Sequence, residues 1–233
     1  MIWMLVTIGL LVNCSTKNSD SMVTVKKFIF NDFQENTYVL YDETGECVII
    51  DCGCYYDDEQ SKLKNFIADN KLKPVKILTT HGHIDHIPGN RFVKETYKIP
   101  IAMHQADQFL VDSVKAYGAT FGFDVDEQPK ADELINDGDT IRFGNSELIA
   151  FHVPGHSPGS IVFYNKQKQF IIAGDVLFYG SIGRTDLPGG SYETLISGIK
   201  SKLLVLPDEV LVYCGHGPET TIGAEKRGNP FLK

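Results

Sequence analysis

The sequence predicts an α+β fold in which two β-sheets pack face to face and helices cover the outer side of both. The length of 233 residues is that of one large mixed domain, and an apolar content of 42% is typical of a globular protein. The predicted elements follow the order strands, helices, strands, helices, in two similar halves without an internal sequence repeat. Two sheets with helices outside both would bury all of the apolar runs at once.

Short β-branched and aromatic runs between turn residues indicate the strands, and amphipathic runs indicate the helices. In the first half we expect strands at 23–30, 36–41, 47–51, 75–79 and 101–103, and helices at 57–70, 90–96 and 104–117. A turn at 43–45 makes the first three strands a meander, and 118–130 is irregular enough to form a loop over a functional site. In the second half we expect strands at 140–143, 147–153, 160–165, 170–173 and 210–214, and helices at 192–204 and 221–227.

Charge and cysteine content limit the partners and the compartment. The formal net charge of −8 argues against nucleic acid or an anionic membrane as a partner, because phosphate binding requires clustered lysine and arginine. The 5 cysteines are an odd number and lack the spacing of a zinc clip. We expect free thiols, and therefore a reducing, cytoplasmic location, with cysteines at Cys14, Cys47, Cys52, Cys54 and Cys214.

Residues 1–21 form an apolar extension before the predicted domain at 22–233. The apolar run is too short to span a bilayer as a helix, and it lacks the basic residues that open a secretory signal. Because Met22 opens a clean strand pattern, translation from Met22 is the preferred explanation. The alternative is an exported or lipid-anchored form through Cys14, since 11–14 faintly resembles a lipoprotein cleavage box.

Three histidines and an aspartate follow the apolar stretch 75–78 almost directly. Side chains two apart at the end of a strand point the same way, so His81 and His83 can hold one metal ion. Asp85 and His86 can turn towards a second ion. A His/Asp cluster of this density predicts a metal site.

Three further fragments place candidate ligands where predicted strands end. His156 lies in a loop rich in glycine and proline, Asp175 ends an apolar strand, and His216 follows the last strand. Strand-to-loop transitions on a rigid scaffold are typical places for functional residues. His104 and His152 stay outside this set, and we expect them to make structural hydrogen bonds or, for His152, to support a ligand.

The set resembles the metallo-β-lactamase superfamily, whose His-x-His-x-Asp-His pattern is present at 81–86. The resemblance covers about 23–233 and implies a four-layer αββα sandwich with a binuclear centre, in which Asp175 would bridge two ions. By this resemblance one ion would be held by His81, His83 and His156, and the other by Asp85, His86 and His216.

The implied ligand set suits hydrolysis. Two ions about 3.5 to 4 Å apart can share a water and lower its pKa to about 7, which gives a metal-bridging hydroxide as the nucleophile. Asp85 could orient this hydroxide and is the candidate catalytic residue. Mixed nitrogen and oxygen ligands favour two divalent ions, with zinc first and iron or manganese as alternatives. A non-catalytic metal-binding domain is a further alternative, although three protein ligands and a shared bridge per ion leave room for water.

Within the superfamily, 180–190 and 215–223 resemble glyoxalase II-related hydrolases, in particular the short YcbL-like bacterial branch. Glyoxalase II hydrolyses S-D-lactoylglutathione, so we expect a small-molecule thioester as the substrate. We expect the protein to be a monomer or a small homo-oligomer. Glyoxalase II continues into a helical domain that helps to bind glutathione, whereas here only 217–233 follow the last histidine. The resemblance therefore implies the thioesterase reaction more strongly than the glutathione carrier. Arg184 could bind a substrate carboxylate or pair with Asp186.

The main alternative is a persulfide dioxygenase, an oxidoreductase of the same fold. Those enzymes hold a single iron at positions that resemble His81, His156 and Asp175, and they share the Gly-Arg-Thr-Asp stretch seen at 183–186. The context of His216 is more similar to that of the hydrolases. We therefore expect a metal-dependent thioesterase of the hydroxyacylglutathione hydrolase type.

Overall fold

The computed structural model describes residues 23–233, so the expectations for the extension 1–21, including its Cys14 anchor, lie outside the described residues. The first sheet has the strand order β1-β2-β3-β4-β5-β6. Its strands are β1 (Thr24–Phe30), β2 (Glu35–Tyr41), β3 (Glu46–Ile50), β4 (Lys73–Leu78), β5 (Ile101–Met103) and β6 (Glu133–Leu134). The first three form the predicted antiparallel meander, and β3 to β6 run parallel.

The second sheet has the order β14-β13-β10-β9-β8-β7, and a short ribbon pairs β11 with β12. The sheet contains β7 (Thr140–Phe143), β8 (Ser146–His152), β9 (Ile161–Asn165), β10 (Phe170–Gly174), β13 (Leu211–Cys214) and β14 (Thr220–Thr221). The ribbon strands are β11 (Leu177–Phe178) and β12 (Ser181–Ile182). Neighbouring strands of the second sheet are antiparallel, except for β10 and β13, which are parallel.

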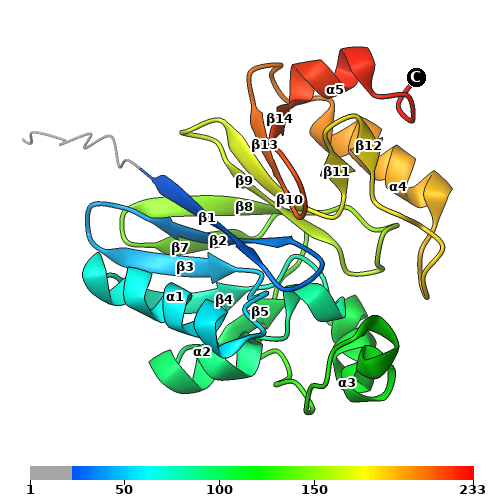
Figure 1. Cartoon of the computed structure of the whole chain (residues 1–233). Coiled ribbons are helices and arrows are strands. Elements are labelled where there is room, and N and C mark those ends of the chain that lie inside the picture. Colours follow the sequence, from blue (N-terminus) through cyan, green and yellow to red (C-terminus); the bar gives the residue numbers. More distant parts are fainter. Residues whose placement is uncertain (1–22) are drawn as a thin grey trace, which may run out of the picture.

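Helices cover the outer side of each sheet, which gives four layers in the order α, β, β, α (Figure 1). On the side of the first sheet lie α1 (Asp57–Asp69), α2 (Asn90–Tyr97) and α3 (Gln108–Tyr117). On the side of the second sheet lie α4 (Tyr192–Gly198) and α5 (Ile222–Gly228). Helix α1 connects the parallel strands β3 and β4, and α2 connects β4 and β5, as parallel pairing requires a crossover of this kind.

Side chains of β2 alternate between the two hydrophobic cores on either side of the first sheet. Tyr38 and Leu40 enter the core between the sheets, which also contains Phe163 and Ile172 of the second sheet. Val39 enters a separate core with residues of α1 and α2. Successive side chains of a strand point to opposite faces, so a strand between two apolar layers is buried on both.

Four short strands and two helix boundaries differ from the sequence expectations. The predicted helix 104–117 begins instead as a 3₁₀ turn, η2 (Gln105–Asp107), before α3. The predicted helix 192–204 changes at Gly198 from α4 to a π-helical segment, η4 (Ile199–Leu203). Strands β6, β11, β12 and β14 have two residues each, so they carry no periodic pattern that a sequence could reveal.

The cysteines of the described chain are free and buried, as expected: Cys47, Cys52, Cys54 and Cys214. Burial raises the pKa of each of these four thiols, which keeps them protonated. No helix between residues 23 and 233 combines the length and the apolar character needed to cross a membrane.

Candidate metal centre

The seven predicted ligands gather at one rim of the sandwich, beyond the ends of four strands. The segment after β4 carries four of them and includes the 3₁₀ turn η1 (Ile84–His86). The other three follow β8, β10 and β13, at His156, Asp175 and His216. Because β10 and β13 are parallel neighbours, their carboxyl ends bring Asp175 next to His216.

The first group of ligand atoms contains His81, His83 and His156, with all three donor atoms within 4.8 Å of one another. The Nε2 atom of His156 lies 2.9 Å from Nδ1 of His83 and 3.2 Å from Nε2 of His81. The side chains come from two segments more than 70 residues apart, since His83 and His156 are separated by 73 positions.

The second group contains Asp85, His86 and His216. The Nε2 atom of His216 lies 3.3 Å from Nε2 of His86 and 3.1 Å from Oδ2 of Asp85. Asp175 lies between the groups: its Oδ1 is 3.4 Å from His86, and its Oδ2 is 3.6 Å from both His156 and His216. The structure thus brings together all seven predicted residues, with Asp175 between the two groups.

In His86, His156 and His216, the imidazole nitrogen that faces away from the centre is held by another group. His156 Nδ1 donates to the carbonyl oxygen of Arg184 at 2.9 Å, and His216 Nδ1 donates to that of Phe33 at 2.9 Å. His86 Nδ1 lies 3.0 Å from Oδ2 of Asp51. A carbonyl oxygen can only accept, so the proton sits on Nδ1 and the Nε2 lone pair faces the centre.

These contacts fit divalent metal ions. The Nε2 atoms of His86 and His216 lie 3.3 Å apart, and those of His81 and His156 lie 3.2 Å apart. Two nitrogens that both carry lone pairs repel each other at such distances unless a cation lies between them. The buried Oδ1 of Asp175 also has no hydrogen-bond partner. A buried carboxylate oxygen without a partner is costly unless a cation compensates it. Five imidazoles and two carboxylates are donors that suit zinc, iron or manganese.

Electrostatics supports the same conclusion. Burial lowers the pKa of His83 to about 3, and burial and the neighbouring His86 lower the pKa of His81. For His86, burial alone would lower the pKa, but the carboxylates of Asp85 and Asp175 outweigh it and raise the pKa. For both carboxylates, burial alone would raise the pKa, but His86 outweighs it and lowers the pKa. His81 and His83 are therefore neutral and the two carboxylates are ionised, which is the state in which such groups bind a metal.

Asp51 supports the centre without belonging to either predicted group. Its carboxylate accepts hydrogen bonds of 2.7 Å from both the amide and the hydroxyl of Thr80, and it also contacts His86. Thr80 Oγ1 in turn lies 3.0 Å from Nδ1 of His81. Asp51 therefore orients one imidazole of each group. The sequence offers one sign of this role. Asp51 directly follows the buried strand 46–50, in the same way that Asp175 follows an apolar strand.

Asp107 is a second supporting residue that the sequence did not reveal. Its buried carboxylate accepts from the amide of Gly82 at 2.9 Å, the hydroxyl of Ser157 at 2.7 Å and the amide of Gly159 at 2.6 Å. A Cβ at Gly159 would lie 2.7 Å from the Asp107 carboxyl carbon, so this close approach requires glycine. Asp107 thus joins the loop of the first two histidines to the loop of His156.

A cavity of about 160 Å³ opens onto the centre. Five of the candidate ligands line it, together with Phe33, Ile84, Tyr117, Phe121, Leu187 and Arg184. Phe121 belongs to η3 (Gly118–Phe121), so the start of the irregular stretch 118–130 does border the site. Arg184 lies at the cavity and also pairs with Asp186, through two hydrogen bonds of 2.7 Å.

The two remaining histidines lie away from the ligand groups. His104 and His152 stack with ring centroids 4.0 Å apart, and His152 Nε2 contacts the carbonyl oxygen of Pro158 at 2.8 Å. His152 therefore steadies the loop that carries His156, and His104 caps η2 by accepting from the amide of Ala106 at 3.2 Å. Both make the structural contacts that the sequence predicts.

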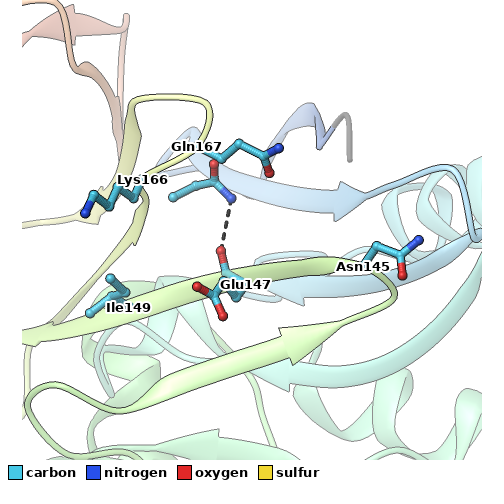
Figure 2. A pocket seen from close by; sticks show the side chains of 6 residues that line it. Asn145, Glu147, Ile149, Lys166 and Gln167 are labelled. Atoms are coloured by element: carbon cyan, nitrogen blue, oxygen red, sulfur yellow. Dashed lines mark hydrogen bonds between the residues drawn. The ribbon is translucent and has the colours of Figure 1, made fainter. Parts of the chain in front are cut away.

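A separate hollow lies at the opposite ends of β8 and β9. Its lining comes from the turn before β8, from β8 itself, and from the end of β9 with the turn that follows it (Figure 2). Asn165 donates a hydrogen bond of 3.0 Å to the carbonyl oxygen of Glu147. Its lining residues are Asn145, Glu147, Ile149, Asn165, Lys166 and Gln167. None of the seven candidate ligands lines it, so the chemistry is concentrated at the other rim.

Comparisons with known proteins agree with this geometry. A family model described as "Metallo-beta-lactamase superfamily" matches residues 30–216. The chain is 43% identical over 201 residues to the probable metallo-hydrolase YqgX of Bacillus subtilis, which covers 85% of this chain and 92% of that protein. It is 39% identical over 202 residues to hydroxyacylglutathione hydrolase GloC of Haemophilus influenzae, which covers 86% of this chain and 93% of that protein.

The fold is shared with solved structures. The crystal structure of TTHA1623 in a di-iron-bound form superposes with a TM-score of 0.80 and 36% sequence identity, covering 89% of this chain and 100% of that one. The predicted four-layer αββα sandwich is thereby confirmed.

Proposed function

Because this chain belongs to the metallo-beta-lactamase superfamily, we propose that it is a metal-dependent hydrolase of thioesters, of the hydroxyacylglutathione hydrolase type. The observation that carries the proposal is the pair of candidate ligand groups that lie on either side of Asp175, since this arrangement suits two ions acting on one substrate. The relative named hydroxyacylglutathione hydrolase GloC supports the choice of thioester. We propose zinc as the metal, with iron or manganese as alternatives that the donors also suit.

Two bound ions would supply an activated water at neutral pH and would polarise the substrate carbonyl. The residues of the chain provide the remaining parts of the reaction. Asp85 is ionised and can accept a hydrogen bond from the attacking water, which orients the water towards the acyl carbon. The oxygen of the attacking water first adds to the acyl carbon, and the carbon–sulfur bond then breaks as the carbonyl re-forms. One proton of the water passes to the departing thiolate, and the other is released from the new carboxylic acid to the solvent. The products are a carboxylate and a free thiol.

The test is an anaerobic assay of the zinc-loaded protein with S-D-lactoylglutathione, together with metal analysis. We expect about two ions per chain, hydrolysis without oxygen, and a fall of about 10²- to 10⁴-fold in kcat for Asp85→Asn. Asp69→Asn serves as the control, because Asp69 is exposed at the end of α1 and does not line the cavity. One iron per chain with oxygen uptake on glutathione persulfide would contradict the proposal in favour of a dioxygenase, and metal binding without turnover would favour a non-catalytic domain.

A further inference from the structure

The candidate ligand His216 is held by a residue of the first sheet. Asn36 of β2 donates two side-chain hydrogen bonds of 3.0 Å each, one to the carbonyl oxygen of Cys214 and one to that of Gly217. These two carbonyls lie on either side of His216 in the chain. The amide of Asn36 also donates to the carbonyl oxygen of Gly215 at 2.8 Å. Asn36 therefore holds the main chain both before and after the ligand.

The side chain of Asn36 is fully buried and is committed to this loop. Asn36 is 1% exposed, and both protons of its side-chain amide point to carbonyl oxygens. A carbonyl oxygen can only accept, so the orientation of the amide group is fixed. Its own Oδ1 is buried without a partner in the described protein, which costs free energy that the two donated bonds offset. The two donated bonds are therefore what this position requires of an asparagine.

The opposite side of the same loop packs against other ligands. A Cβ at Gly215 would lie 2.1 Å from Oδ1 of Asp175 and 3.0 Å from Cε1 of His86, so the main chain comes as close to the centre as a glycine permits. The loop is thus fixed between the ligands on one side and Asn36 on the other. Without the side chain of Asn36, the loop can move away from the centre and carry His216 with it.

The imidazole ring of His216 is held by the turn that precedes β2. Its Nδ1 donates to the carbonyl oxygen of Phe33 at 2.9 Å. Its Nε2 then faces the second ligand group, 3.1 Å from Oδ2 of Asp85 and 3.3 Å from Nε2 of His86. Because the main chain is fixed on both sides of His216 and one ring nitrogen is engaged, the direction of Nε2 is set before an ion binds.

The first ligand group has supports of its own. His81 is contacted by the hydroxyl of Thr80, and His156 donates to a main-chain carbonyl oxygen that follows β12. The side-chain hydrogen bonds of Asn36 end within 214–217 and reach neither of these histidines. Removal of the Asn36 amide should therefore affect the second ion much more than the first.

We propose that Asn36 is the positioning residue for the second ion: it aims His216 at the second ligand group and thereby sets whether the centre holds two ions or one. The inference rests on the two-ion centre of the proposed function. It concerns metal affinity, so it does not depend on which substrate the protein hydrolyses.

The experiment titrates the metal-free protein with zinc against a chelating dye and resolves the two binding steps. We expect Asn36→Ala to weaken one step about 10- to 100-fold and to leave the other nearly unchanged. A double variant with Asn36→Ala and His216→Ala should bind zinc as His216→Ala alone does, because a residue that acts through His216 has no effect in its absence. Asn165→Ala is the matched control, since Asn165 is 2% exposed and donates a bond of the same 3.0 Å to a main-chain carbonyl at the other rim. Equal weakening of both steps, or of neither, would overturn the inference.

A second variant separates this role from a general contribution to folding. Asn36→Asp keeps the shape of the side chain but cannot donate at neutral pH, so its loss of zinc affinity should be at least as large as that of Asn36→Ala. Both variants keep the main-chain bond to Gly215 and the bond of 2.6 Å from the Tyr38 hydroxyl to the carbonyl oxygen of Cys214. We therefore expect both to fold, as measured by circular dichroism, and unfolding of both would contradict a role confined to the His216 loop.

Turnover distinguishes a positioning residue from a catalytic one. In Asn36→Ala, kcat on S-D-lactoylglutathione should recover as excess zinc fills the second site, whereas that of Asp85→Asn should not. A kcat of Asn36→Ala that stays low when both sites are full would reject a role through the metal. If the unmodified protein binds two ions but hydrolyses no thioester, the proposed function fails and the zinc titrations still decide the inference. Binding of a single ion by the unmodified protein would overturn the inference together with the two-ion centre.

Discussion

At the scale of single residues, the candidate centre depends on the atoms that hold each ligand from behind. Four imidazoles have their outer nitrogen engaged, two of them by main-chain carbonyls. Asp51 contacts the outer nitrogen of His86 directly, and it holds the Thr80 hydroxyl that contacts the outer nitrogen of His81. Such contacts fix the tautomer and the ring orientation before a metal binds.

We expect Asp51→Asn to weaken metal binding about 10- to 100-fold, because the amide cannot accept from both Thr80 and His86 as the carboxylate does. The measurement is a competition titration of the metal-free protein against a chelating dye. Asp208→Asn is the matched control, since Asp208 is exposed and pairs with Lys226 and Arg227 of α5. Unchanged affinity in Asp51→Asn would show that this carboxylate has no supporting role.

Histidines inside and outside the centre should respond differently to removal. His83→Ala should lower the metal content from about two ions per chain to about one, because it removes one of the three imidazoles of the first group. His104→Ala should leave the metal content unchanged, since His104 stacks on His152 away from the ligands. Elemental analysis after gel filtration measures both. A loss of metal in His104→Ala would contradict the assignment of the two groups.

At the scale of elements, the loop that carries His156 is fixed by close packing against α4. Gly155 has a φ of +133°, where side chains are rarely tolerated, and a Cβ there would lie 2.5 Å from the amide nitrogen of Leu195. The amide of Ser191 donates to the Gly155 carbonyl at 2.8 Å. The direction of His156 therefore depends on a helix that follows it by more than thirty positions.

We expect Gly155→Ala to destabilise the metal-free protein by about 1 to 3 kcal/mol, because the new methyl group forces both strain at positive φ and overlap with Leu195. Urea unfolding monitored by circular dichroism measures the change. Gly228→Ala is the control, since Gly228 has no such conformation and no atom within 4 Å of the added carbon. Equal stabilities of the two variants would argue against the packing account.

The elements also show where sequence patterns lose information. The apolar periodicity predicts one helix across 192–204, yet the helix changes to a π-helical segment at η4 while the apolar residues Leu195, Ile199 and Leu203 stay in one core. Periodicity reports which side chains are buried and is insensitive to the exact hydrogen-bond pattern beneath them. The same limit applies to the two-residue strands, which form because neighbouring strands offer them partners.

At the scale of the whole molecule, Asp42 links the two sheets. It lies after β2 of the first sheet, and its carboxylate accepts from the amide of Asn145 in the β7–β8 turn and from the hydroxyl of Ser146 at the start of β8, at 2.7 Å each. Burial alone would raise the pKa of Asp42, but hydrogen bonds from Thr44 and Ser146 outweigh it and lower the pKa below its ordinary value. The link is therefore strongest when the carboxylate is ionised.

This link predicts a dependence of stability on pH. A group with a lowered folded pKa contributes its full stability above its unfolded pKa, about 3.9 for aspartate, and loses it as the pH falls through the folded pKa. Asp42→Asn should therefore lower the free energy of unfolding by about 1 to 3 kcal/mol at pH 7, and this difference should shrink below about pH 4. Urea unfolding across this range measures it, with the exposed Asp69→Asn as the control. A difference that does not vary with pH would rule out the ionised carboxylate as its source.

The sequence by itself determined the order of the long strands and helices and the seven candidate ligands. These depend on local signals: alternation of apolar residues along a strand, and metal-binding side chains placed where an apolar run ends, as at His81, Asp175 and His216. Each signal is contained within a few neighbouring positions, so folding preserves it.

Only the tertiary structure decided how closely the two ligand groups approach Asp175 and which residues support them. Asp107 meets the amide of Gly159 across 52 positions, and Asp51 meets His86 across 35. It also decided that Phe33, Tyr117 and Phe121 border one cavity beside the ligands. Contacts of this kind depend on strand order and on the packing of the two sheets, and no local pattern in a chain records which distant residue will be its neighbour.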